Sequence, residues 1–186
     1  MKLFDTIKVF FPNDKEIIDF MQEHTKSLEV KKGELISRNG SYNRNIYFVE
    51  DGLVRSFYLE NGKDITTNFY SEGKLVSNID TLFQNTPTRF NIEALENSTM
   101  LYCDYQNLEA LCKESLPAAN FSRYILGNLM AQMSNRMTSL QYMTAKQKYE
   151  DLMEENKDII LRAPLGMIAT YLGISPETLS RIRSSI

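Results

Sequence analysis

The 186-residue chain is poor in the residues that build metal centres and disulfide frameworks, with two cysteines, one histidine and no tryptophan. Cys103 and Cys112 are too few for the disulfide framework of a small secreted protein. The single histidine, His24, excludes a histidine-rich metal site. Metal oxygenases and isomerases built on β-barrels generally need two or three histidines, so the sequence argues against them.

Long apolar runs are also absent, because no stretch approaches the roughly 20 residues that a membrane-spanning helix requires. Residues 1–7 contain an early acidic residue and no small-residue cleavage site, which is untypical of a secretory signal. Spacings typical of a Ser/His/Asp triad, a Cys/His pair or a glycine-rich phosphate loop are missing too. We therefore expect a cytoplasmic protein that is neither an enzyme nor a membrane protein.

A surplus of positive charge is missing as well, and a net charge of −3 argues against a protein that coats nucleic acid regardless of sequence. Within residues 162–186 the sign is reversed, since Arg162, Arg181 and Arg183 stand against Glu177 alone. This asymmetry indicates a modest DNA-binding module attached to an acidic body. Because phosphate contacts set much of the affinity for DNA, such a module is expected to bind as a dimer.

Residues 163–186 carry the most informative pattern, which is that of a helix-turn-helix. Pro164 is typical of the start of a helix, and the apolar residues after it recur at the spacing of a buried stripe. Gly173 supplies a tight turn, and Ser175 followed by Pro176 predicts the N-cap and first residue of a second helix. The stripe consists of Ile168, Ala169 and Leu172.

The second helix presents two contrasting faces. Leu179, Ile182 and Ile186 share an apolar inner face, and the polar residues Glu177 and Arg181 lie opposite. An arginine on a short polar face is suited to reading base edges in the major groove. A helical hairpin that closes a core without touching nucleic acid is the alternative. The predicted DNA-binding residues are Ser175, Pro176, Glu177, Thr178, Ser180, Arg181 and Ser184.

Between residues 27 and 104 the sequence alternates short runs of β-branched and aromatic residues with turn residues. Its glycines recur at a spacing close to that of strands in an antiparallel sandwich or barrel. The dipeptides Asp51-Gly52 and Asn61-Gly62 are suited to two-residue hairpin turns, because both residue types adopt positive φ. The runs that predict strands are Leu28–Lys31, Glu34–Ser37, Ile46–Val49, Leu53–Leu59, Ile65–Tyr70, Phe90–Leu95 and Met100–Cys103.

Beyond Asp104 the pattern becomes helical. Asp104 is suited to cap a helix over Tyr105–Glu114, and Pro117 starts a longer helix. Apolar residues along the longer helix have the spacing of a coiled-coil seam, which either pairs with a second copy or packs on the chain's own β domain. Helices are also expected over Thr144–Asn156 and Lys157–Arg162, so no flexible linker separates the domains. The seam consists of Leu126, Met130, Met133, Met137 and Leu140.

The chain resembles the Crp/Fnr transcription regulators, and in particular their short Bacteroidetes-type members, in two regions. Their DNA-binding signature is similar to Ile168-Ala-Thr-Tyr-Leu-Gly-Ile-Ser-Pro-Glu-Thr-Leu-Ser-Arg-Ile-Arg183. The landmarks that resemble their cyclic-nucleotide-binding domain are Lys32-Gly-Glu34, Gly40, Ile46-Tyr-Phe-Val-Glu-Asp-Gly52, Asn61-Gly62 and Ile92-Glu-Ala-Leu95.

The resemblance implies an α+β fold with three parts. An N-terminal antiparallel double-stranded β-roll of the cyclic-nucleotide-binding type precedes a long dimerisation helix and a small all-α helix-turn-helix domain. The expected boundaries are 1–114 for the β-roll effector domain with flanking helices, 115–143 for the dimerisation helix and 144–186 for the helix-turn-helix domain. Because the family has a dimerising helix at this point, the resemblance favours pairing of the seam with a second copy.

In the family, a Gly-Glu-Leu turn binds the ribose of cyclic AMP, and an Arg-Ser pair binds its phosphate. The corresponding residues are expected at Gly73-Lys74-Leu75 and Thr88-Arg89. Lys74 stands at the position of the glutamate. Arg89 is displaced by one position from the family's arginine, and along a strand a displacement of one residue turns a side chain to the other face of the sheet. We therefore expect an altered effector pocket that does not take cyclic AMP as its native ligand.

No resident cofactor is expected. An iron–sulfur cluster is normally held by four cysteine thiolates, and the chain has two cysteines. One histidine also argues against haem.

The resemblance implies a homodimeric transcription regulator that binds double-stranded DNA at a palindromic operator. RNA polymerase and an unknown small-molecule effector are its further expected partners. Arg181 is expected to contact a guanine edge and Glu177 a cytosine, since both match base-reading positions of the family. Pro176 stands where many relatives carry a basic residue, which indicates a different operator sequence.

The alternative is a small-molecule sensor that acts through protein partners, with weak or no specific DNA binding. Its support is that the sequence ends at Ile186, directly after the predicted recognition helix. Many relatives continue into strands that brace this helix, and a short helix is marginal unless it is packed.

Overall fold

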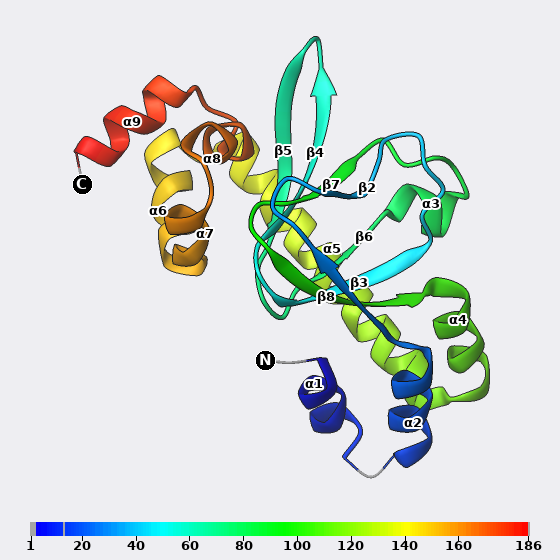
Figure 1. Ribbon diagram of the computed structural model, residues 1–186. Coiled ribbons are helices and arrows are strands. Elements are labelled where there is room, and N and C mark those ends of the chain that lie inside the picture. The colour runs from blue at the N-terminus through cyan, green and yellow to red at the C-terminus, as the bar shows by residue number, and fades with distance from the viewer. Residues whose placement is uncertain (1–2, 13, 186) are drawn as a thin grey trace.

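The computed structural model describes residues 3–12 and 14–185. Within these ranges the chain begins with two short helices, continues through a β domain and ends in a series of helices (Figure 1). The expected α+β fold is confirmed: a β-roll is followed by a long helix and a C-terminal helical domain. Across the described residues, no helix combines the length and the apolar character needed to cross a membrane.

The β-roll consists of two four-stranded antiparallel sheets. Their strand orders are β1-β8-β3-β6 and β2-β7-β4-β5, and a core of buried residues from both sheets lies between them. The strands are β1 (Lys26–Val30), β2 (Leu35–Ser37), β3 (Asn45–Asp51), β4 (Val54–Glu60), β5 (Lys63–Tyr70), β6 (Leu75–Ser77), β7 (Asn91–Ala94) and β8 (Ser98–Asp104). This core consists of Val30, Tyr47, Val49, Val54, Val76, Ile92, Ala94 and Met100.

The predicted strands match β1 to β5, β7 and β8, with differences only at their ends. Strand β6 and helix α3 (Ile79–Gln84) were not predicted from the sequence. These elements have three and six residues, which is too short for hydrophobic periodicity to be visible.

The two predicted hairpin turns have different outcomes. Asn61 and Gly62 have φ angles of 50° and 76° and close the β4–β5 hairpin, which confirms the prediction. The prediction for Asp51-Gly52 is wrong, because β3 and β4 lie in different sheets. With a φ of 107°, Gly52 instead lets the chain pass close to Ser98, whose Oγ would lie 2.2 Å from a Cβ at this position.

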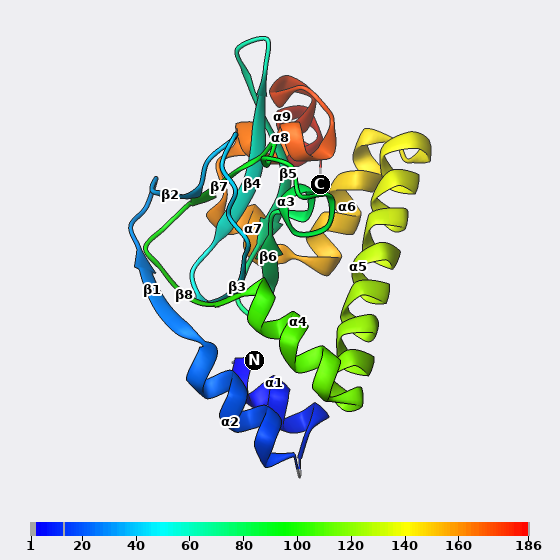
Figure 2. The ribbon, with the colours of Figure 1, turned by 90° about the vertical axis from the view of Figure 1, so that its right-hand side faces the viewer.

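Helices gather at two ends of the roll (Figures 1 and 2). Helices α1, α2 and α4 lie near the start of the long helix α5, and α6 to α9 lie near its end. Asp104 caps α4, as predicted, by accepting a hydrogen bond from Gln106 N at 2.7 Å. Only Met143 and Thr144 separate α5 from α6, so the predicted connection without a flexible linker is confirmed. The helices are α1 (Leu3–Phe10), α2 (Lys15–His24), α3, α4 (Tyr105–Glu114), α5 (Leu116–Tyr142), α6 (Ala145–Glu155), α7 (Lys157–Arg162), α8 (Leu165–Leu172) and α9 (Pro176–Ser184).

Candidate nucleic-acid interface and ligand pocket

The predicted helix-turn-helix is formed by α8 and α9. Gly173 ends α8 in the left-handed conformation, with a φ of 67° and a ψ of 35°. Ser175 caps α9, because its Oγ accepts a hydrogen bond from Thr178 N at 3.2 Å, and Pro176 is the first residue of the helix. Pro164 is the N-cap residue of α8, so this helix begins directly after the proline.

The inner faces of α8 and α9 are buried in a common core. Ile182 is half-buried against this core, whereas Ile186 lies outside the described residues. The burial fixes α9 on α8, so that the outer face of α9 has a rigid support. The inner residues with an exposed fraction of at most 1% are Ile168, Ala169, Leu172 and Leu179.

The predicted DNA-binding residues lie on the outer face of α9 or beside it, and all of them are exposed except Thr178, which is half-buried and lies off this face. Arg181 Nε donates a hydrogen bond to the Glu177 carbonyl at 3.5 Å, and Ser184 Oγ donates to the Arg181 carbonyl at 2.9 Å. Hydrogen bonding from the Ser175 side chain lowers the pKa of the Glu177 carboxyl, which therefore stays ionised at neutral pH. The face thus offers an arginine donor and a carboxylate acceptor one helical turn apart.

The predicted seam of α5 is exposed along its length. The exposed fraction is 36% for Leu126, 72% for Met130, 66% for Met133, 62% for Met137 and 43% for Leu140. This exposure contradicts the alternative in which the seam packs on the chain's own β domain. An exposed apolar stripe at heptad spacing is typical of a surface that pairs with another helix.

The residues of the predicted effector pocket lie on two separate segments. Gly73 N donates a hydrogen bond to Val49 O at 2.9 Å, and Val49 N donates to Lys74 O at 3.0 Å. These bonds hold a turn before β6, in which Leu75 pairs with β3. Thr88, which is 1% exposed, belongs to the segment that contacts α3, beyond the opposite end of β6.

Arg89 is bound to a carboxylate of its own domain. Its Nε and Nη2 donate hydrogen bonds to the two oxygens of Asp80 at 3.0 and 3.1 Å, and its main-chain N donates at 3.3 Å. Hydrogen bonding from Arg89 holds the pKa of the buried Asp80 carboxyl below its ordinary value. The Arg89 side chain is 76% exposed. It lines a groove of about 470 Å³ together with Asn39, Tyr58, Leu59, Glu60 and Phe90.

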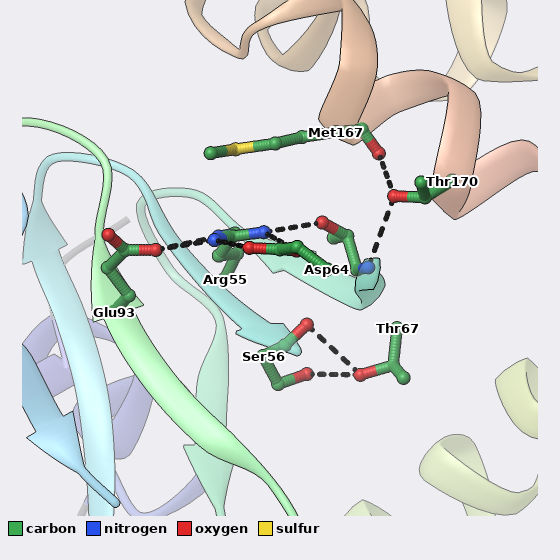
Figure 3. Close-up of polar contacts among 8 residues, drawn as sticks. Arg55, Ser56, Asp64, Thr67, Glu93, Met167 and Thr170 are labelled. Atoms are coloured by element: carbon green, nitrogen blue, oxygen red, sulfur yellow. Dashed lines mark hydrogen bonds and ion pairs between the residues drawn. The ribbon is translucent and has the colours of Figure 1, made fainter. Parts of the chain in front are cut away.

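Neutral polar side chains in the interior of the roll were not predicted from the sequence, and most of them are buried. Ser56 Oγ lies 2.8 Å from Thr67 Oγ1, which also donates to Ser56 O at 3.1 Å (Figure 3). Asn78, which is 2% exposed, donates through Nδ2 to Ser37 Oγ at 2.9 Å. These hydroxyl and amide groups satisfy one another without a charge. Asn78 directly precedes α3. A sequence-based prediction of this short helix would therefore have drawn attention to Asn78 as the residue at its start.

A polar contact joins α8 to the β-roll. Thr170 Oγ1 accepts a hydrogen bond from Thr66 N of β5 at 3.2 Å and donates to Met167 O at 3.1 Å (Figure 3). Arg55 of β4, which is 2% exposed, fixes Thr66 by donating to its Oγ1 at 2.9 Å. Arg55 also donates to both carboxylate oxygens of Asp64 at 2.6 Å, so the strand that meets α8 is held by a charged cluster.

Arg162 of α7 forms a second polar contact with the roll. Its Nη1 and Nη2 donate to the Glu72 carboxylate at 3.0 and 2.8 Å, and its Nε donates to Glu96 at 3.3 Å. Hydrogen bonding from Arg162 lowers the pKa of Glu72 to about 2. Arg162, which contributes to the positive balance of residues 162–186, is therefore engaged in the contact between the domains.

Comparison with known proteins matches residues 27–115 to the cyclic nucleotide-binding domain family. The regulatory protein HlyX of Actinobacillus pleuropneumoniae is 24% identical over 165 residues, which cover 82% of this chain and 68% of HlyX. The structure of FixK2 from Bradyrhizobium japonicum has a TM-score of 0.75 and 21% identity, covering 87% of this chain and 83% of FixK2. A protein described as a Crp/Fnr-family transcriptional regulator, from Eubacterium rectale, has a TM-score of 0.71 and 18% identity, covering 95% of this chain and 85% of its own.

The matched domain and the fold define the class first: the β-roll is a cyclic nucleotide-binding domain followed by a long helix and a C-terminal helical domain. In sequence and in fold the chain is similar to transcription regulators of the Crp/Fnr type. These matches do not test the narrower Bacteroidetes-type grouping, which stays a prediction.

Replacing Arg162 by glutamine is expected to lower the free energy of unfolding at pH 7 by roughly 1–2 kcal/mol, because two partly screened carboxylates lose their partner. The folded-state pKa of Glu72 lies below its ordinary value of 4.5. The stabilisation is therefore complete above pH 4.5 and is lost as the pH falls toward 2. Urea unfolding at a series of pH values measures the difference between the two proteins.

The matched control is Lys146→Gln, which removes an exposed pair with Glu150 whose charged atoms are 3.6 Å apart. This change is expected to cost less than about 0.5 kcal/mol. A loss for Arg162→Gln that matches the control, or that is independent of pH, would contradict a stabilising role for the contact.

Proposed function

We propose that the chain binds a palindromic DNA operator as a homodimer and regulates transcription there. The observation that carries this proposal is the exposed polar face of α9, which is supported from behind by a buried core. Residues 1–114 serve as the effector domain, 115–143 as the dimerisation helix and 144–186 as the DNA-binding domain. Such a regulator acts in the cytoplasm, with RNA polymerase as its further partner.

The recognition helix reads the operator through α9 residues that face away from the core. Arg181 donates to the O6 and N7 acceptors of guanine, and the ionised Glu177 accepts from a cytosine amino group. Ser180 and Ser184 contact either bases or phosphates. Thr178 and Arg183 lie off this face, and they either contact phosphates or pack within the protein.

Replacing Arg181 by alanine is expected to cost roughly 1–3 kcal/mol of binding to the operator, with little effect on random-sequence DNA. The reason is that a base contact contributes only where the correct base is present. The matched control, Arg183→Ala, is expected to weaken binding to both DNAs equally. Mobility-shift titrations with both duplexes at a fixed salt concentration measure these losses.

Equal losses on both duplexes for Arg181→Ala would instead assign Arg181 to a phosphate contact. If the unaltered protein binds every operator tested no more tightly than random DNA, the proposal of sequence-specific DNA binding fails. The alternative, a small-molecule sensor that acts through protein partners, is then favoured.

The homodimer forms through the seam of α5. Its exposed methionines are flexible and polarisable, and they suit a surface whose packing adapts to a second helix. A dimer also brings two recognition helices to half-sites that are one helical turn apart, as a palindromic operator requires.

Replacing Met133 by glutamate is expected to raise the dimer dissociation constant by at least about 100-fold, because two charges would be buried without partners. The fold is unaffected, since Met133 is 66% exposed in the single chain. The control Asn128→Glu changes an exposed residue of the same helix off the seam and leaves the dimer intact. Sedimentation at micromolar concentration measures the change, and an unaltered protein that is strictly monomeric there would contradict the dimer.

Cyclic AMP is not the native ligand of the roll in this proposal. Support comes from Arg89, whose guanidinium is neutralised by Asp80 and lies at an outward groove. A ligand phosphate would meet the Asp80 carboxylate as well as the guanidinium. The side chains of the buried Ser56 and Asn78 and of the half-buried Thr67 are neutral, so they supply no positive charge for an anionic ligand.

Calorimetric titration with cyclic AMP is expected to show no saturable binding at ligand concentrations up to about 1 mM. A Kd of about 1 mM would correspond to a binding free energy of only about −4 kcal/mol. Tight, saturable binding of cyclic AMP would overturn this part of the proposal and leave the DNA-binding part standing.

A further inference from the structure

Tyr171, near the end of α8, is in contact with two other parts of the molecule. Its ring packs edge-on against Phe69 of β5, with a distance of 5.2 Å between the ring centroids. The guanidinium carbon of Arg136, from α5, lies 3.9 Å from the centroid of the Tyr171 ring. Arg136 Nη2 also donates a hydrogen bond to the Tyr171 carbonyl. The β-roll, the long helix and the helix-turn-helix therefore meet at one side chain.

Arg136 is held at this place by the ring and the carbonyl. Within the described residues it forms no ion pair. Burial lowers the pKa of its guanidinium, whose charge faces the negative end of the α8 dipole. Its partners are thus a carbonyl and an aromatic face of α8, which fix a direction and not only a distance.

Helix α5 touches the turn between α8 and α9 at a second point, one helical turn after Arg136. A Cβ at Gly173 would lie 3.3 Å from Leu140 Cδ2. Leu140 is also the last residue of the seam, and Arg136 lies between Met133 and Met137 of the same seam. The stretch of α5 proposed to face the second copy is therefore the stretch that holds the turn leading into α9.

We propose that Arg136 and Tyr171 are positioning residues for operator binding. They set the angle of α9 relative to α5, and so relative to the dimer axis. This inference rests on the proposed function, because a dimer reads a palindrome only when both recognition helices keep a fixed separation and angle. Phe69 connects the same ring to β5, so that a displacement of the β4–β5 hairpin also reaches Tyr171.

The test uses the full-length dimer and a set of operators whose half-sites are moved apart by one or two base pairs. The unaltered protein is expected to bind the shifted operators at least about 30-fold more weakly, within the range typical of coupled sites. Arg136→Gln and Tyr171→Leu are expected to bind the natural spacing about 10-fold more weakly and to lose most of the discrimination between spacings. Dimerisation and binding to random DNA stay unchanged, because the Arg136 side chain is directed to Tyr171 and is not one of the seam residues.

Conservative variants provide the matched controls. Tyr171→Phe keeps the ring and is expected to behave like the unaltered protein, because the contacts with Phe69 and Arg136 use the ring and the main-chain carbonyl of Tyr171. Arg136→Lys keeps a charged donor and is expected to recover part of the discrimination that glutamine loses. In the double variant Arg136→Gln/Tyr171→Leu, the loss is expected to be smaller than the product of the single losses, since both changes remove the same contact.

Variants that keep the full spacing discrimination of the unaltered protein would overturn the inference while leaving DNA binding intact. An unaltered protein that binds no operator specifically would instead defeat the proposed function itself. If Arg136→Gln or Tyr171→Leu does not fold, the spacing series with Arg136→Lys decides, and unchanged discrimination in that variant counts against the inference.

Discussion

Leu53 and Leu95 of the β-roll lie in the same buried cluster as Tyr149, Leu152 and Ile159 of the C-terminal helices. Each of these side chains is at most 9% exposed. Because the cluster belongs to both domains, separating them would return apolar surface to water, at about 1.5–3 kcal/mol for each large side chain. The place of α9 on the protein therefore depends on the whole chain, and the C-terminal helices do not behave as a tethered unit.

Hydrophobic burial has little directionality, so the orientation of the helical domain comes from its polar and aromatic contacts. Thr170 accepts from the backbone of β5, and Arg162 joins α7 to two carboxylates of the roll. Arg136 and Tyr171 add a contact from α5. These contacts surround α8, the helix that carries the turn into α9. A change at the β4–β5 hairpin or in the α5 seam has a direct physical route to the recognition helix.

The helix-turn-helix could be predicted from sequence because its signals are local: Gly173 with positive φ, and Ser175 with its capping bond. The pocket could not, because its contacts depend on tertiary structure. Asp80 binds Arg89 from an α3 helix too short to show periodicity, and nothing local reveals that pairing. The meeting of three parts of the chain at Tyr171 is likewise set by packing.

In the proposed dimer, two recognition helices keep a fixed separation. Selection of bound duplexes from a random pool, with and without candidate small molecules, tests this arrangement. We expect an enriched palindrome whose half-site centres lie one helical turn apart, about 10–10.5 base pairs. Enrichment of a single half-site, of repeats without two-fold symmetry or of no sequence at all would contradict it.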